Sequence, residues 1–126
     1  MSPKATILVA EDELPLRAAL HDKLSTQGFT VLEASNGEEG LALALAHQPS
    51  LILLDVLMPK MDGLTMLKQL RQDPRGKNIQ VIMLSNFSDN DKVAEALQSN
   101  VNYYLVKADW PLDKIVQIVH QHLTAN

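Results

Sequence analysis

The stretch LILLDVLMPKMDG, residues 51–63, predicts a buried strand that ends in an acidic loop. Residues 51–54 are all apolar, and an unbroken apolar run of this length is typical of a strand covered on both faces. Asp55 ends the run, and Pro59 and Gly63 then fix the backbone of the loop before the next helical segment. The runs ATILVA at 5–10 and IQVIML at 79–84 have the same character. Together the three runs predict a parallel sheet.

Longer segments with helical spacing separate the apolar runs. Two further strands are predicted at residues 29–34 and 102–106. The helical segments carry apolar residues three or four positions apart, namely Leu16, Leu20 and Leu24; Leu41 and Leu45; Leu64, Leu67 and Leu70; Val93 and Leu97; and Leu112, Ile115, Val119 and Leu123. A strand followed by a helix, five times over, predicts an α/β protein with a doubly wound parallel sheet and helices on both faces.

The composition is that of an ordinary globular domain. The chain has 126 residues, of which 46% are hydrophobic and 21% charged, and this length suits one domain over residues 1–126. The net charge of −4 is unfavourable for binding nucleic acid or an anionic membrane. The absence of cysteine excludes disulfides, thiolate zinc sites and thiol nucleophiles. No apolar run approaches the ~20 residues that span a bilayer, so we expect a cytoplasmic protein that binds neither membrane nor nucleic acid directly.

Acidic, hydroxyl and ammonium side chains stand where the predicted strands end. Glu11 and Asp12 follow the first strand, Asp55 the third, Ser85 the fourth and Lys107 the fifth. Because the carboxyl ends of parallel strands share one edge of the sheet, we expect these side chains to meet there. Three carboxylates and one ammonium leave an excess of negative charge that a divalent cation would cancel, and oxygen donors suit Mg²⁺ or Mn²⁺. A metal ion beside an ammonium group can also hold a phosphoryl group.

Four segments together resemble the receiver domain of bacterial two-component response regulators. They are ILVAEDE at 7–13, DVLMPKMDG at 55–63, MLS at 83–85 and YYLVK at 103–107. The resemblance spans nearly the whole chain, and the ordered set of acidic, serine and lysine positions makes it specific. It implies a flavodoxin-like (βα)5 fold, similar to the chemotaxis regulators, with strand order 2-1-3-4-5. It also implies a phosphorylation-dependent switch of a phosphorelay rather than a turnover enzyme.

The resemblance implies a phosphoacceptor and a metal site among these residues. Asp55 would take a phosphoryl group from the phosphohistidine of a sensor histidine kinase or of a histidine phosphotransfer protein. Mg²⁺, or Mn²⁺ in its place, would bind the carboxylates of Asp12 and Asp55 and the carbonyl oxygen of Leu57. Glu11 would lie close to the ion and act through a metal-bound water.

The resemblance also implies a switch that reports phosphorylation to a partner. Lys107 and the Ser85 hydroxyl would bind phosphoryl oxygens, and Tyr104, three residues before the lysine, matches the switch aromatic of the family. When Ser85 follows the phosphoryl group, Tyr104 would occupy the vacated space. The face formed by the fourth helix, the fifth strand and the fifth helix would then change shape, and an output protein of unknown identity would sense it.

The sequence departs from the family pattern beside two of these residues. The family usually has a cis proline after the lysine, whereas Ala108 follows Lys107 here. A cis bond before alanine would cost about 3 kcal/mol, so we expect a trans bond. Leu57 and Phe87, each two residues beyond Asp55 or Ser85, are apolar and offer no group to orient a hydrolytic water. We therefore expect a long-lived phosphoryl state.

Three alternatives remain open at the sequence level. A pseudo-receiver would be a binding module with this fold but without phosphotransfer, and Ala108 is the departure that keeps it open. The chain could equally be a receiver fragment of a larger regulator or hybrid kinase. A phosphohydrolase with Asp55 as its nucleophile is disfavoured, because such enzymes commonly carry a second aspartate two residues on, where this chain has Leu57.

Two further predictions concern polar residues outside this set. Asp62 is expected to cap the helix that follows it rather than to bind metal. The four histidines are scattered along the chain, and we expect all of them to lie on the surface.

Overall fold

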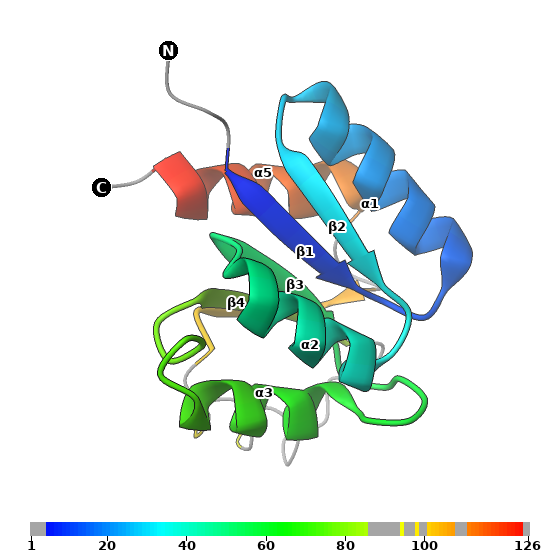
Figure 1. Cartoon of the computed structure of the whole chain (residues 1–126). Coiled ribbons are helices and arrows are strands. Elements are labelled where there is room, and N and C mark those ends of the chain that lie inside the picture. The colour runs from blue at the N-terminus through cyan, green and yellow to red at the C-terminus, as the bar shows by residue number, and fades with distance from the viewer. Residues whose placement is uncertain (1–4, 86–93, 95–97, 99–100, 108–110, 125–126) are drawn as a thin grey trace.

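Five parallel strands form the centre of the molecule (Figure 1). The computed structural model describes residues 5–85, 94, 98, 101–107 and 111–124. The strands are β1 (Thr6–Ala10), β2 (Thr30–Ala34), β3 (Leu51–Asp55), β4 (Gln80–Ser85) and β5 (Tyr103–Val106). Their order in the sheet is β2-β1-β3-β4-β5, and every neighbouring pair is parallel. The predicted α/β class and the strand order 2-1-3-4-5 are confirmed.

Helices cover both faces of this sheet, as predicted. They are α1 (Leu14–Thr26), α2 (Gly37–His47), α3 (Gly63–Gln72) and α5 (Leu112–Thr124). Figure 1 shows α1 and α5 on one face, and α2 and α3 on the other. The helix predicted between residues 89 and 100 lies outside the described residues, apart from positions 94 and 98. In the part of the chain that the structure describes, no helix is long and apolar enough to cross a bilayer.

Strand β3 shows why an unbroken apolar run predicted a central strand. All five of its residues are buried, and alternate side chains enter different cores because successive side chains of a strand point to opposite faces. Ile52 and Leu54 pack in the core beneath α2 and α3, whereas Leu51 and Leu53 pack in the core beneath α1 and α5. A polar residue at any of these four positions would be buried without water on either face.

Helix ends follow the local signals in the sequence. The Asp62 carboxylate accepts a hydrogen bond of 2.8 Å from the Thr65 amide, which confirms that this aspartate caps α3. Asn36 caps α2 in the same way through the Glu39 amide. Helix α1 ends at Thr26, and Gly28 follows with a φ of 93°, which glycine adopts without steric cost. These caps fix where α2 and α3 begin relative to the sheet edge.

Candidate functional site

An acidic cluster lies where the neighbouring strands β1 and β3 end. Strands β1 and β3 are neighbours, and their register pairs Ala10 with Leu54, so that Glu11 and Asp55 occupy equivalent places at the edge. One carboxylate oxygen from each of Glu11, Asp12 and Asp55 lies within 4.8 Å of the others. Glu11 and Asp55 are buried and Asp12 is exposed. The parallel topology therefore brings together the three carboxylates that the sequence selected.

Lys107 reaches this cluster from the end of β5. Its ammonium nitrogen lies 2.6 Å from Glu11 Oε1, 3.3 Å from Asp55 Oδ1 and 3.5 Å from Glu13 Oε2. The side chain is only 9% exposed. Burial alone would lower the pKa of Lys107, but its three acidic neighbours more than offset this and raise the pKa above its ordinary value. Lys107 is therefore a fixed positive charge in the site.

Burial, together with the charge of the cluster, disfavours ionisation of Asp55 in the metal-free protein. Burial, first, and the charge of Glu11, second, raise the pKa of Asp55 to about 8, although Lys107 acts in the opposite direction. A single ammonium thus does not balance the carboxylates around it. A divalent cation at the cluster would restore the ionised form of Asp55, because it supplies the missing positive charge.

The residues present fit such a cation. The donors are all oxygens, which Mg²⁺ and Mn²⁺ prefer. Glu11 Oε2 accepts a hydrogen bond of 3.0 Å from the Glu13 amide. The other oxygen, Oε1, is buried and forms the ion pair with Lys107, yet among the described residues it has no hydrogen bond of good geometry. The cluster therefore offers a buried carboxylate oxygen with capacity to bind a further positive charge.

The loop that follows Asp55 is folded tightly against the strand ends. The Val56 amide donates to the Leu84 carbonyl at 3.1 Å, and the Gly63 amide donates to the Val56 carbonyl at 2.8 Å. Between these bonds Lys60 takes a φ of 67°, a left-handed conformation. Leu57 is 47% exposed, so solvent reaches this part of the loop. This position is compatible with the carbonyl role that the resemblance implies for Leu57.

Ser85 lies on β4, the neighbour of β3, and Tyr104 lies on β5, the next strand along the sheet. Ser85 is the last residue of β4 and is buried, and the preceding residue, Leu84, pairs with Asp55 in the register. Tyr104 is half-buried in β5 and packs against the core beneath α2 and α3. Ala108 and Phe87 lie outside the described residues, so the predictions about the bond after Lys107 and about the second apolar position stay predictions.

The structure adds two polar residues that the sequence reasoning did not assign to the site. Glu13 contacts Lys107 and, through its amide, Glu11. Arg17 donates a hydrogen bond of 2.9 Å from Nη1 to the Glu11 carbonyl. In the sequence, only its spacing of four residues from Glu13 could have indicated that Arg17 lies near the site. Such a spacing is common on any helix. Of the four histidines predicted at the surface, His47 is exposed, whereas His21, His120 and His122 are half-buried. His21 contacts Glu33, and the other two rings pack against Phe29 and Tyr103.

Replacing Lys107 with methionine is expected to destabilise the metal-free protein by about 3 kcal/mol, because it leaves the buried Glu11 carboxylate without its cation. The measurement is the free energy of unfolding from urea titration in EDTA. Lys23→Met is the matched control, since Lys23 pairs with Asp113 at 2.6 Å but the two side chains are 47% and 80% exposed. That variant is expected to lose much less stability, because an exposed ion pair contributes little. Equal losses in both variants would contradict this account of the cluster.

Comparison with known proteins identifies the family. A family model described as the response regulator receiver domain matches residues 7–120. The chain belongs to this family. The receiver domain is 36% identical over 104 residues to a protein of Porphyridium aerugineum named "Probable transcriptional regulator ycf27". The match covers 82% of this chain and 42% of that protein, so the chain spans less than half the length of this relative.

Solved structures agree with this assignment. The chemotaxis response regulator CheY4 of Vibrio cholerae superimposes on the receiver domain with a TM-score of 0.87 and 26% identity, over 95% of this chain and 99% of that chain. The Mn²⁺-bound form of response regulator Rcp1 gives a TM-score of 0.81 and 29% identity, over 97% and 96%. The predicted resemblance to response regulators, chemotaxis regulators included, is therefore confirmed.

The relatives bear differently on the predictions about cofactor and partners. A homologue with Mn²⁺ bound accords with the all-oxygen cluster of this receiver domain. The prediction that the chain does not bind nucleic acid directly gains no support, because a relative is named as a transcriptional regulator. Net charge alone does not decide this point, since it describes the whole chain and not one of its surfaces.

Proposed function

We propose that this receiver domain, residues 1–126, is a phosphorylation-dependent switch that accepts a phosphoryl group on Asp55. The donor would be the phosphohistidine of a sensor histidine kinase or of a histidine phosphotransfer protein in the cytoplasm. The observation that carries the proposal is the position of the buried Asp55 carboxylate, 3.3 Å from the Lys107 ammonium and within reach of Glu11 and Asp12. Catalysis of phosphoryl transfer is mostly positioning and charge stabilisation, and these groups supply both.

The proposed transfer assigns a separate task to each residue. An Asp55 oxygen attacks phosphorus, the bond between phosphorus and the imidazole nitrogen breaks, and the nitrogen keeps the electron pair. Lys107 and the Ser85 hydroxyl stabilise the charge on the phosphoryl oxygens. The product is an acyl phosphate on Asp55.

A divalent cation completes the proposed site. Asp12 and Asp55 would hold Mg²⁺, or Mn²⁺, through their carboxylates, with the Leu57 carbonyl as a third ligand and Glu11 acting through a water. When bound, the ion supplies positive charge that favours ionised Asp55 and stabilises the phosphoryl oxygens. The buried Glu11 oxygen and the excess of acidic groups support this assignment.

Readout of the phosphoryl group is proposed to run through Ser85 and Tyr104. Ser85 ends β4, which neighbours β3, and Tyr104 is half-buried on β5, the strand paired with β4. A shift of Ser85 toward the phosphoryl group would leave room for the ring to move inward. The surface of β5 and α5 would change with it, and an output protein that prefers one shape would respond.

A switch fits the site better than a hydrolase does. Position 57, two residues beyond the acceptor, is the apolar Leu57, which cannot act as an acid or base toward water or a leaving group. We therefore propose slow loss of the phosphoryl group and no turnover of small phosphate esters. Sustained release of phosphate from such esters would favour the hydrolase instead.

The first test is the intact mass of the protein after incubation with acetyl phosphate. With Mg²⁺ present we expect a gain of one phosphoryl group, and with EDTA in its place we expect none, since the cluster then lacks the charge that keeps Asp55 ionised. No gain under conditions where Mg²⁺ still binds, as measured by calorimetric titration, would overturn the proposal and leave a pseudo-receiver that acts as a binding module.

A further inference from the structure

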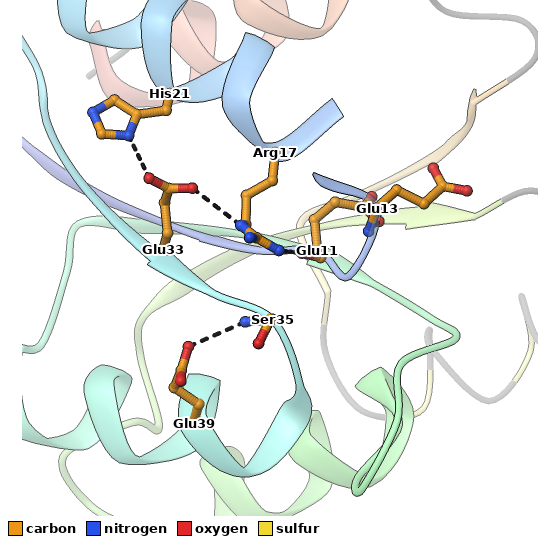
Figure 2. Close-up of polar contacts among 7 residues, drawn as sticks. All are labelled: Glu11, Glu13, Arg17, His21, Glu33, Ser35 and Glu39. Atoms are coloured by element: carbon orange, nitrogen blue, oxygen red, sulfur yellow. Dashed lines mark hydrogen bonds and ion pairs between the residues drawn. The ribbon is translucent and has the colours of Figure 1, made fainter. Parts of the chain in front are cut away.

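A chain of polar contacts joins the acidic cluster to side chains of α1 and β2 (Figure 2). Arg17 Nη1 donates to the Glu11 carbonyl at 2.9 Å, and Arg17 Nε donates to Glu33 Oε1 at 3.0 Å. His21 Nδ1 lies 2.5 Å from the second oxygen of Glu33. Figure 2 shows Glu33 of β2 between His21 and Arg17 of α1, with Arg17 also reaching Glu11 just beyond the end of β1. The proposed function assigns no role to Arg17, Glu33 or His21.

The contact with Glu11 is made to the peptide group between the two acidic residues. The Glu11 carbonyl belongs to the rigid peptide plane that joins Glu11 to Asp12, so holding this oxygen restricts the backbone on both sides. The Glu11 amide is held as well, because it donates to the Ala34 carbonyl at 3.0 Å. The direction in which both carboxylates leave the backbone therefore depends on the Arg17 contact.

Arg17 is itself held in place. Its side chain is only 16% exposed, and the planar guanidinium reaches the Glu11 carbonyl and the Glu33 carboxylate from two different nitrogens. The hydrogen bond from His21, followed by that from Arg17, keeps the pKa of Glu33 below its usual value, although its partial burial acts in the opposite direction. Glu33 is therefore an ionised anchor that fixes the orientation of Arg17.

We propose that Arg17 is a positioning residue for the metal site: it holds the Glu11–Asp12 peptide so that both carboxylates face the cation, and Glu33 and His21 hold Arg17. This inference rests on the proposed Mg²⁺ site and adds residues of α1 and β2 to it. Residues that orient metal ligands in this way typically affect metal affinity by about tenfold or more when they are removed.

The sign of the effect on Mg²⁺ affinity tests this role. Arg17→Gln removes a positive charge near the cluster, so Coulomb's law alone predicts tighter binding of a divalent cation. Loss of positioning predicts the opposite, an increase of about tenfold in the Mg²⁺ dissociation constant. Calorimetric titration of the full chain with MgCl₂ measures this dissociation constant and distinguishes between the two predictions. An unchanged or smaller dissociation constant would overturn the proposal.

A second variant keeps the charge and changes only the geometry. Arg17→Lys retains one positive charge, but its single ammonium cannot reproduce the two-sided contact, so we again expect several-fold weaker Mg²⁺ binding. A dissociation constant equal to that of the wild type in this variant would show that charge, and not positioning, is what Arg17 contributes. If Arg17→Gln folds poorly, the Mg²⁺ affinity of Arg17→Lys still tests the proposal.

Arg75→Gln is the matched control. Arg75 also pairs with a carboxylate, Asp73, at 2.9 Å, but the pair lies beyond the end of α3 that is remote from Asp55. We expect this variant to bind Mg²⁺ as the wild type does.

A second measurement is independent of the metal. We expect the backbone amide NMR signals of Asp12 and Glu13 to move in metal-free Arg17→Gln and to stay in place in the Arg75→Gln control. If the wild type itself binds no Mg²⁺, the proposed metal site fails together with this inference, whereas normal wild-type binding with unchanged variants overturns the inference alone.

Discussion

Asparagine in place of Asp55 is expected to abolish the gain of a phosphoryl group and, at the same time, to stabilise the metal-free protein. The first effect follows because the neutral amide offers no carboxylate oxygen to attack phosphorus. Intact mass after incubation with acetyl phosphate and Mg²⁺ measures it directly. A mass gain equal to that of the wild type would show that another residue is the acceptor.

The second effect follows from the crowding of charge around position 55. Asp55 is 3% exposed and lies beside the buried Glu11, with Lys107 shared between them. In the Asp55→Asn variant, the Lys107 ammonium faces the Glu11 carboxylate alone instead of two acidic groups, so the positive and negative charges balance. A gain on the order of 2 kcal/mol in the free energy of unfolding is expected at neutral pH in EDTA, which corresponds to several degrees in the unfolding midpoint for a domain of this size.

The pH dependence of this gain gives a further check. Folding raises the pKa of Asp55 from 3.8 to about 8, so the folded protein holds a proton that the unfolded chain releases. The stability of the metal-free wild type should therefore fall as the pH rises between these values, while the Asp55→Asn variant lacks this contribution. The gain is expected to be absent near pH 3.8 and complete above pH 8. A gain that stayed constant across this range would contradict the electrostatic explanation.

Asp22→Asn is the control for both effects. Asp22 is exposed on α1, so its replacement should change neither the mass gain nor the midpoint by a measurable amount. Saturating Mg²⁺ should shrink the advantage of Asp55→Asn, because the cation stabilises the wild type by binding only its folded form. An advantage of the same size with and without Mg²⁺ would indicate that Asp55 does not contribute to a metal site.

Alanine in place of Gly63 is the second substitution with a large expected effect. A β-carbon at position 63 would lie 2.0 Å from the carbonyl oxygen of Asp55, and this oxygen is backbone that cannot rotate away. The loop or the end of β3 must therefore move. We expect a loss of about 3 kcal/mol or more in the free energy of unfolding. Because the displaced strand end carries Asp55, slower phosphoryl acceptance is expected as well.

Gly40→Ala is the matched control for this substitution. A β-carbon there would meet the sulfur of Met66 at 2.9 Å, and a flexible thioether can move aside. Alanine is also favoured over glycine within a helix by up to about 1 kcal/mol, so the two effects offset each other. We expect a change within about 1 kcal/mol, measured by urea titration. A loss for Gly63→Ala as small as that of the control would contradict the close approach of α3 to β3.

The sequence predicted the fold well because its signals are local. The apolar run before Asp55 required a strand buried on both faces, and alternation with helical segments required parallel pairing. The gathering of Glu11, Asp12 and Asp55 followed from topology alone, because parallel strands end at one edge. The helix predicted between residues 89 and 100 lies outside the described residues apart from positions 94 and 98, and so does the bond after Lys107, so these predictions stay untested.

The sequence by itself thus determined the class of fold, the family and the edge at which the acidic groups meet. Only the tertiary structure decided how these groups are paired. Lys107 lies closer to Glu11 than to Asp55. Arg17 donates hydrogen bonds to the Glu11 carbonyl and to the carboxylate of Glu33, a residue of another strand. The physical reason is one of range: strand and helix patterns depend on neighbours a few residues apart, whereas these pairings join side chains distant in sequence, and packing selects their rotamers.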